Sequence, residues 1–308
     1  MIRIDLRIGL SYEIDADGAD FVFNVHAART ARQRLSAETL QLDPPLASTL
    51  HTDAVTGNRR LRLHALAGAL RLEYAVVVEL DHRRADPAQL AEVPVQDLPP
   101  HVLGYLYASR YCQSDLLTKL AADEFGKLPR GHARVQAIAD WVHRHVAFTP
   151  NSSNASTSAL DTLAARVGVC RDFAHLMIAL CRAVGVPARF VTGTDYGADP
   201  ALGPSDFHAY VEAYLGERWV IFDPAGTGIP MGYVRIGTGR DAADVAFATV
   251  FGGVVTHAPT VRATALADAA RGIVLPHPCG EALCTDDGAE PTGSTSAAVA
   301  SSQGHTRT

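Results

Sequence analysis

The sequence predicts an α+β protein in which a β-sandwich precedes a unit built first from helices and then from an antiparallel sheet. Apolar residues occupy every second position from residue 2 to residue 14, the period of a strand with one buried face. From about residue 101 the apolar spacing becomes three and four, the period of an amphipathic helix. Later, two apolar runs flank Gly216 and Glu217 as in a β-hairpin. Helices followed by paired strands are typical of the α+β class.

The first predicted domain covers residues 1–85. The alternation of residues 2–14 returns on either side of Gly68, which predicts a second hairpin. Several strands without a helical period indicate a β-sandwich of ordinary small-domain size. Residues 86–100 combine several prolines with polar residues, a composition typical of a linker.

The second predicted domain covers residues 101–284. An amphipathic helix is expected over residues 133–147, and a capping box formed by Ser158 and Asp161 is expected to open another helix that runs through Ala165. A third helix is expected from Cys170 to Val184, where the Gly-Val-Pro sequence that follows stops it. The expected strands are residues 188–192, 209–215 and 218–222. Residues 285–308 lack aromatic side chains and are rich in Ser, Thr, Ala and Gly, which predicts a disordered tail.

Composition excludes several classes of partner. The 308 residues carry a net charge of −6 and a pI near 6.1, so no electrostatic surface for nucleic acid or an anionic membrane is expected. No signal peptide and no membrane span is expected, and the five irregularly spaced cysteines suit reduced thiols, so a cytoplasmic location is predicted. No CxxC or HxxxH spacing supports a metal, and no cofactor is expected. The remaining partners are small molecules, peptides or proteins. The sequence leaves the oligomeric state of the protein open.

Cys170 is the candidate nucleophile. It follows Gly168 and Val169 at the predicted start of a helix, where unpaired backbone N–H groups and the helix dipole stabilise a thiolate. The backbone N–H of Cys170 is also placed to donate to an oxyanion on the attacked carbonyl. A nucleophile of this kind needs a base, and the base needs a group that orients it.

His208 and Asp223 are the candidates for those two roles. His208 begins one strand of the predicted hairpin, and Asp223 ends the other. Because the turn lies near their midpoint, pairing of the strands should bring the imidazole beside the carboxylate. Two neighbours of Cys170 have plainer interpretations: Asp172 opposes the helix dipole in the first turn, and His175 is expected to be a buried, hydrogen-bonded histidine.

Several motifs carry a resemblance to bacterial transglutaminase-like proteins. Residues 168–193, GVCRDFAHLMIALCRAVGVPARFVTG, resemble the nucleophile segment of that family, residues 207–212 its histidine strand and residues 219–224 its aspartate strand. Residues 109–115 and 239–245 resemble flanking elements. The resemblance runs from about residue 100 to residue 255, and the N-terminal strands look like the family's accessory β domain.

The resemblance implies a papain-like core with a triad at Cys170, His208 and Asp223. Two positions depart from the family's pattern: Arg171 stands where Gln is common, and Tyr210 where Trp or another aromatic residue is common. Both are expected on the approach of the substrate. The side-chain donor of the oxyanion hole is not identified by any motif, and Asn151, Asn154 and Gln136 are candidates by chemistry alone.

Two classes of function follow from the resemblance. The first is acyl transfer from a peptide or protein amide through a cysteine thioester, with hydrolysis by a peptidase or amidase favoured over crosslinking by a protein-glutamine transglutaminase. The second is a binding or scaffold module that keeps the fold without turnover. An intact Cys, His and Asp in the expected order favours the enzyme.

Overall fold

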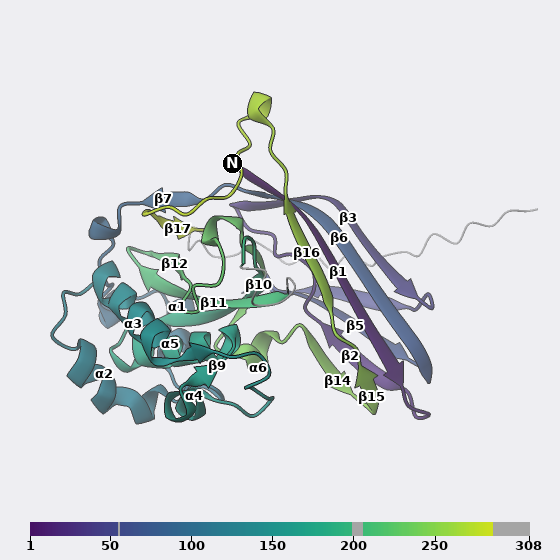
Figure 1. Ribbon diagram of the computed structural model, residues 1–308, viewed down its shortest axis with the longest axis horizontal. Coiled ribbons are helices and arrows are strands. Elements are labelled where there is room, and N and C mark those ends of the chain that lie inside the picture. Colours follow the sequence, from purple (N-terminus) through teal and green to yellow (C-terminus); the bar gives the residue numbers. More distant parts are fainter. Residues whose placement is uncertain (55, 199–205, 286–308) are drawn as a thin grey trace, which may run out of the picture.

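The computed structural model describes residues 1–54, 56–198 and 206–285, which form a β-sandwich packed against an α+β domain (Figure 1). The helices cover one face of a central antiparallel sheet, and the sandwich lies against its other face. The predicted α+β fold class is confirmed. Among the described residues no helix is long and apolar enough to cross a membrane.

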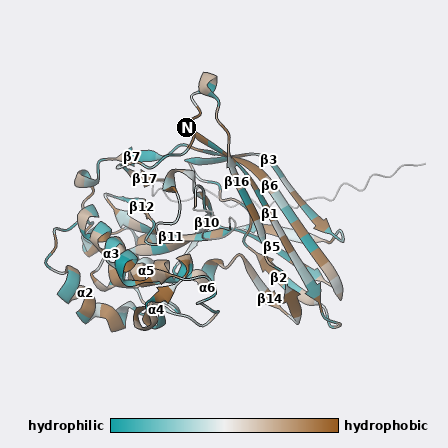
Figure 2. Ribbon diagram, in the orientation of Figure 1, coloured by the Kyte–Doolittle hydropathy of each residue, from teal (hydrophilic) through white to brown (hydrophobic). Residues whose placement is uncertain are grey.

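The sandwich consists of two antiparallel sheets. One has the order β15-β1-β6-β3, with β16 also paired to β1, and the other has the order β14-β2-β5-β4. The strands are β1 (Ile2–Ile14), β2 (Ala19–Phe23), β3 (Gln33–Asp43), β4 (Ser48–Thr52), β5 (Arg59–Ala65), β6 (Gly68–Leu80), β14 (Ala248–Phe251), β15 (Val254–Thr256) and β16 (Thr260–Ala265). Hydrophobic and hydrophilic residues alternate along β1 and β6 (Figure 2), and the even-numbered side chains of β1 are buried between the sheets.

The second domain, predicted over residues 101–284, is interrupted by residues 248–265. Strands β14, β15 and β16 return to the sandwich, where β14 pairs with β2 and the other two pair with β1. They cover strand edges that would otherwise expose unpaired backbone groups. The predicted hairpin at Gly68 is wrong, because β5 and β6 belong to different sheets. The alternation of apolar residues tells which face of a strand is buried, but not which strand lies beside it.

The central sheet of the α+β domain has the strand order β12-β11-β10-β13. Its strands are β10 (Ala188–Thr194), β11 (Phe207–Leu215), β12 (Arg218–Phe222) and β13 (Val234–Gly239). The helices are α1 (Pro100–Leu103), α2 (Thr118–Phe125), α3 (His132–His145), α4 (Ala159–Ala165), α5 (Cys170–Ala183) and α6 (Ala242–Val245). The predicted helices, the capping box at Ser158 and the hairpin through Gly216 are confirmed within a few residues.

Helix α5 is the centre of the α+β domain. Every residue from Asp172 to Arg182 is buried, so the helix is surrounded by the sheet on one side and by other helices on the rest. A helix this enclosed cannot tilt without disturbing the whole core. The first residue of α5 is therefore held at a fixed place relative to the sheet.

Short elements fasten the remaining segments. β7 (Arg83–Ala85) pairs with β17 (Ala282–Cys284), and β8 (Ala147–Phe148) pairs in parallel with β9 (Val167–Gly168). Single 3-10 turns lie at Pro87–Gln89, Val95–Asp97, Gly104–Leu106, Ser114–Leu117, Pro230–Gly232 and Ala269–Arg271.

Residues 86–100, predicted as a linker, are packed against the α+β domain. Leu90 and Leu98 are buried, and the Glu92 carboxylate accepts from Arg134 Nε at 2.8 Å and from the Gly131 N–H at 2.9 Å. The proline-rich composition predicted a linker, but it did not reveal these contacts or the short 3-10 turns. Of the predicted tail, Thr285 is buried, and its carbonyl accepts from Thr30 Oγ1 at 2.7 Å, while residues 286–308 lie outside the described residues.

Candidate active site

The start of α5 holds Cys170 in place. Strand β9, which pairs in parallel with β8, leads directly into the helix. Val169 is the N-cap residue of α5 and has extended dihedral angles. The Asp172 carboxylate turns back to accept from the Val169 N–H at 2.9 Å, which is the acidic half of a capping box. As the first residue of α5, Cys170 has no acceptor within the helix for its own N–H. The sequence predicts that this N–H donates to the oxyanion, and that role stays a prediction.

Arg171, the next residue, holds a loop beside the nucleophile. Its Nη2 atom donates to the Asn154 carbonyl at 2.6 Å and to Ser153 Oγ and the Thr157 carbonyl at 3.2 Å each. The guanidinium also lies over the ring of Tyr111, 5.3 Å from its centroid. These contacts bind the Arg171 side chain to the loop of residues 153–157. The expected contact of Arg171 with substrate stays a prediction.

His208 and Asp223 meet across the hairpin of β11 and β12. Val211 pairs with Phe222. His208 lies three residues before Val211 and Asp223 directly follows Phe222, so both come to the same end of the sheet. The His208 Nε2 atom lies 3.3 Å from Asp223 Oδ2, and both side chains are almost fully buried. The Cys170 thiol is one of the groups that raise the pKa of His208, so it lies close to the same imidazole. Because Nε2 faces Asp223, Nδ1 is the ring nitrogen left for the thiol.

The charges of this pair are coupled. Burial opposes the charged form of His208, but the Asp223 carboxylate and the Cys170 thiol outweigh that effect, so the pKa of His208 is raised well above its ordinary value. Burial likewise disfavours the Asp223 carboxylate, whereas His208 and then the Tyr233 hydroxyl lower the pKa of Asp223 below its ordinary value. An imidazolium between a carboxylate and a thiol favours the thiolate that acyl transfer requires.

Tyr233 is a member of the site that the sequence did not indicate. Its hydroxyl donates to Asp223 Oδ2 at 2.5 Å, and its ring lies 4.8 Å from the ring of His208. Asp223 Oδ1 accepts from the Ala225 N–H at 3.1 Å. Tyr233 precedes an edge strand, so its position follows only from the strand order of the folded sheet.

Tyr210 does not lie on the approach of the substrate, and that prediction is wrong. Its side chain is fully buried and packs 5.2 Å from the ring of Tyr233. The face of β11 that carries His208, Tyr210 and Glu212 is the one covered by the sandwich. Of these three, His208 lies at the end of the strand that is nearest Cys170, and the Cys170 thiol contributes to its raised pKa.

The interpretations of Asp172 and His175 are confirmed. Asp172 is buried and accepts from Ser153 Oγ at 2.9 Å in addition to the Val169 N–H. His175 is buried, its Nε2 accepts from the Ala242 N–H at 3.2 Å, and its ring stacks on Tyr111. Burial, then Arg171 and Arg182, lower the pKa of His175 well below its ordinary value, so it stays neutral and structural.

The three candidate oxyanion side chains lie on the surrounding loops and helix. Asn154 closes its own turn, since its Oδ1 accepts from the Ser156 N–H and hydroxyl at 2.8 and 2.7 Å. Gln136 on α3 donates to Asp140 at 2.8 Å. Asn151 is exposed and has a left-handed backbone with φ of 62°. The Gln136 amide donates to Asp140, whereas the bonds of Asn154 use its acceptor oxygen, so neither set of bonds assigns the side-chain donor of the oxyanion hole.

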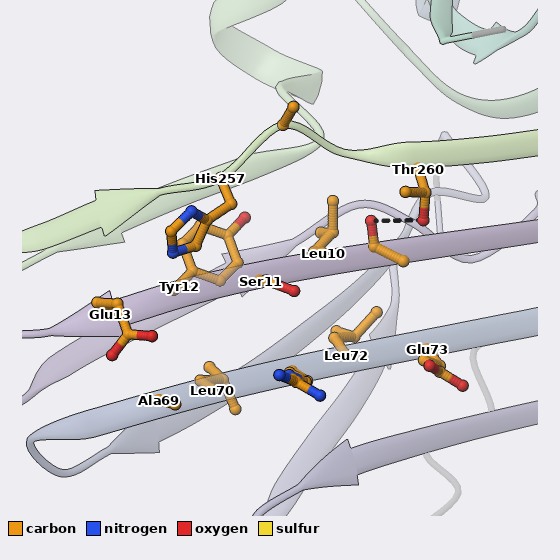
Figure 3. A pocket seen from close by; sticks show the side chains of 13 residues that line it. Leu10, Ser11, Tyr12, Glu13, Ala69, Leu70, Leu72, Glu73, His257 and Thr260 are labelled. Atoms are coloured by element: carbon orange, nitrogen blue, oxygen red, sulfur yellow. Dashed lines mark hydrogen bonds between the residues drawn. The ribbon is translucent and has the colours of Figure 1, made fainter. Parts of the chain in front are cut away.

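Two hollows help to place the site. Figure 3 shows one on the sandwich, between β1, β6 and residues 257–260, where Tyr12, Glu13 and His257 line it and no triad residue does. The second lies beside Asp223, between α3, the end of β12 and residues 277–283. The reactive groups therefore lie at the junction of α5 with the sheet, away from the hollow of Figure 3.

Two segments of the chain match described families. Residues 119–224 match the transglutaminase-like superfamily, and residues 2–101 match the N-terminal domain of bacterial transglutaminases. The first segment contains Cys170, His208 and Asp223. An uncharacterized protein of Mycobacterium leprae is 35% identical over 117 residues, which cover 36% of this chain and 42% of that protein. A protein of Bacillus subtilis, YebA, is 28% identical over 143 residues, which cover 39% of this chain and 19% of YebA.

A solved structure extends the similarity to nearly the whole chain. A candidate cysteine protease from Cytophaga hutchinsonii is 37% identical, with a TM-score of 0.85, over 92% of this chain and 97% of that one. The match includes the sandwich as well as the α+β domain, so both parts of the fold are shared. The chain belongs to the transglutaminase-like superfamily.

Proposed function

We propose that the protein is a cysteine-nucleophile enzyme that cleaves an amide bond of a peptide or protein through a thioester on Cys170. The observation that carries the proposal is the position of the His208 imidazole, which lies 3.3 Å from Asp223 and whose pKa is raised by Asp223 and by the Cys170 thiol. Nucleophile, base and orienting carboxylate arranged in this order are the components of thiol-dependent acyl transfer.

The reaction has two halves. In the first, the Cys170 thiolate attacks the amide carbonyl carbon, and the oxyanion accepts from the Cys170 N–H. The C–N bond then breaks, and the His208 imidazolium gives its proton to the leaving amine or ammonia. In the second half water attacks the thioester, His208 takes a proton from that water, and the carboxylic acid leaves as the C–S bond breaks.

Hydrolysis is favoured over transfer to an amine. The Cytophaga hutchinsonii protein, which shares both domains, is described as a candidate cysteine protease, and this supports water as the acceptor. Crosslinking would differ only in the second half, where a lysine amine would take the place of water. The same triad serves either acceptor, so the products must decide between them.

The experiment compares the three products directly. The purified chain is incubated with glutamine-containing peptides, with and without a primary amine, and ammonia, new peptide ends and the amine adduct are quantified by mass spectrometry. We expect cleavage or deamidation without the amine and little adduct with it. The variant Cys170→Ala should lose on the order of 10⁴-fold of the turnover.

A second thiol variant serves as the control. Cys279 is partly exposed, as Cys170 is, and Cys279→Ser should keep the activity of the wild type. Circular dichroism would verify that both variants fold. Wild-type turnover in Cys170→Ala would overturn the proposal, and amine adduct as the main product would replace hydrolysis by crosslinking.

A further inference from the structure

The Tyr233 hydroxyl and His208 share one oxygen atom of Asp223. Oδ2 accepts from the Tyr233 hydroxyl at 2.5 Å and lies 3.3 Å from His208 Nε2. Tyr233 is only 1% exposed, and its ring contacts both His208 and Tyr210. A carboxylate turns freely about its last bond unless its oxygens are held, so the hydroxyl fixes the orientation of the oxygen that faces the imidazole.

Tyr233 is in turn placed by β13, the strand that begins at the next residue. β13 is at the edge of the central sheet and pairs with β10 on one side only. A bulge in that pairing lies between Thr192 and Gly193. An edge strand that carries a bulge needs additional contacts to keep its register.

The sandwich supplies those contacts with two side-chain amides. Gln33 donates from Nε2 to the Arg235 carbonyl at 2.8 Å and accepts the Arg235 N–H at 2.9 Å. Asn58 donates from Nδ2 to the Thr238 carbonyl at 2.7 Å and accepts the Thr238 N–H at 2.8 Å. Each amide thus satisfies both backbone groups of one outward-facing residue, as a neighbouring strand would.

All four groups are buried, which makes these bonds hard to replace by water. Gln33 and Asn58 are each 1% exposed, and Arg235 and Thr238 are 2% and 1% exposed. Gly237, between the two clamped residues, packs closely against Asn58: a Cβ there would lie 3.1 Å from Asn58 Oδ1 and would require a small shift of the amide. The amide clamp is therefore part of the interface between the domains.

We infer that Tyr233 is a positioning residue for Asp223 and His208, and that the N-terminal sandwich holds it in place through Gln33 and Asn58. The accessory domain then contributes to the reaction without touching the substrate. This inference rests on the proposed thiol chemistry of Cys170. It assigns to the sandwich a role in keeping the imidazolium beside the thiol.

The variant Tyr233→Phe tests the hydroxyl, because it keeps the ring and its packing. The measurement is the rate at which iodoacetamide labels Cys170, read by mass spectrometry at pH 6 and at pH 9.5. At pH 6 an imidazolium partner raises the thiolate fraction of a thiol, whereas an unassisted thiol ionises near pH 8.5. We expect labelling of Tyr233→Phe to be slower than wild type by about tenfold at pH 6 and equal to it at pH 9.5.

The clamp is tested with a matched pair of asparagines. Asn58→Leu removes the contact with Thr238. Asn24→Leu removes another buried amide that joins the sandwich to the second domain, since Asn24 Nδ2 donates to the Ala246 carbonyl at 2.7 Å. We expect Asn58→Leu to lower the ratio of the rates at pH 6 and pH 9.5, as Tyr233→Phe does, and Asn24→Leu to keep the wild-type ratio.

The outcomes separate this inference from the proposed function. If wild-type Cys170 is not labelled readily at pH 6, the proposed thiol chemistry itself fails. If the wild type is labelled and Tyr233→Phe has the same ratio, Tyr233 does not position the triad. Equal ratios in Asn58→Leu and Asn24→Leu would show that the sandwich does not hold Tyr233 through Asn58. If Asn58→Leu fails to fold, the Tyr233→Phe result remains an independent test.

Discussion

Gly168 lies so close to Asp172 that a Cβ atom on residue 168 would come within 2.8 Å of the Asp172 Cβ. Asp172 is the residue whose carboxylate caps the Val169 N–H immediately before Cys170. The close approach of a glycine and a capping aspartate therefore sets the position of the nucleophile. The absence of a side chain at residue 168 is a requirement of the site and not only of the turn.

The variant Gly168→Ala should consequently damage catalysis more than folding. The added methyl group must push Asp172 away from the Val169 N–H, and a shift of about 1 Å in a nucleophile costs on the order of 100-fold in rate. Overpacking of this kind costs about 1–3 kcal/mol of stability. Turnover and thermal melting of the same preparation measure the two effects. Gly104→Ala is the control, because nothing lies within 4 Å of a Cβ there, and equal activity of both variants would contradict the prediction.

His208 and Asp223 should act as one unit with Cys170. Asp223→Asn places a neutral amide beside Nε2, which can hold the wrong tautomer of the imidazole, so turnover should fall by about 10⁴-fold. His208→Ala should approach the loss seen in Cys170→Ala. Because the residues are coupled, the double variant should be little worse than His208→Ala alone. Losses that multiply would instead mean that the two residues contribute independently.

The sequence was sufficient to place the three candidate residues on their elements, because each lies at or near the end of a strongly patterned element. The apolar spacing of α5 placed Cys170 at a helix start, and the turn through Gly216 and Glu217 fixed the register of the hairpin. Both signals are local: they depend on residues within one element or on one tight turn. The buried faces of β1 and β6 were predictable for the same reason, since their apolar residues alternate.

The contacts between distant segments were not predictable in this way. Tyr233 and Asp223 are joined across the loop that separates β12 from β13, and Gln33 contacts Arg235 about two hundred residues away. Nothing in the local sequence marks these partners. A single side-chain amide that bonds a strand's backbone leaves no periodic pattern in the sequence, unlike a neighbouring strand. The burial of Tyr210 and the return of β14 to the sandwich were missed because they too depend on packing between elements.

The five thiols should differ sharply in reactivity at mildly acidic pH. The pKa of His208 is raised well above its ordinary value, so its ring remains an imidazolium beside Cys170 at pH 6. Burial raises the pKa of Cys112 and of Cys181 to about 12, so these thiols stay protonated. At pH 6 a limiting amount of iodoacetamide should therefore label Cys170 first, with the partly exposed Cys279 as the internal reference. As the pH rises through the folded-state pKa of His208, the imidazolium is lost, and the preference for Cys170 should shrink; faster labelling of Cys279 at pH 6 would contradict the prediction.

The stability of the sandwich should fall as the pH drops below 6.5, because His26 is buried without a charge. Burial, and then Arg59, lower the pKa of His26 to about 4, and the side chain is only 3% exposed. In the unfolded chain His26 takes up a proton near pH 6.5, while in the folded chain it remains neutral until about pH 4. The unfolded state thus binds more protons in this window, and unfolding becomes easier as the pH falls, by about 2 kcal/mol between pH 7 and pH 5.

Urea unfolding at pH 7, 6 and 5 measures this effect while most carboxylates are still ionised. His26→Gln removes the titrating group, so the loss of unfolding free energy between pH 7 and pH 5 should shrink by about 2 kcal/mol. His51→Gln changes an exposed histidine of the same domain and should leave the pH dependence as in the wild type. The ring of His26 packs 4.8 Å from that of Tyr74, so His26→Gln is expected to be less stable than wild type at pH 7. The prediction concerns the slope with pH, and an unchanged slope in His26→Gln would show that His26 is not the group that takes up the proton.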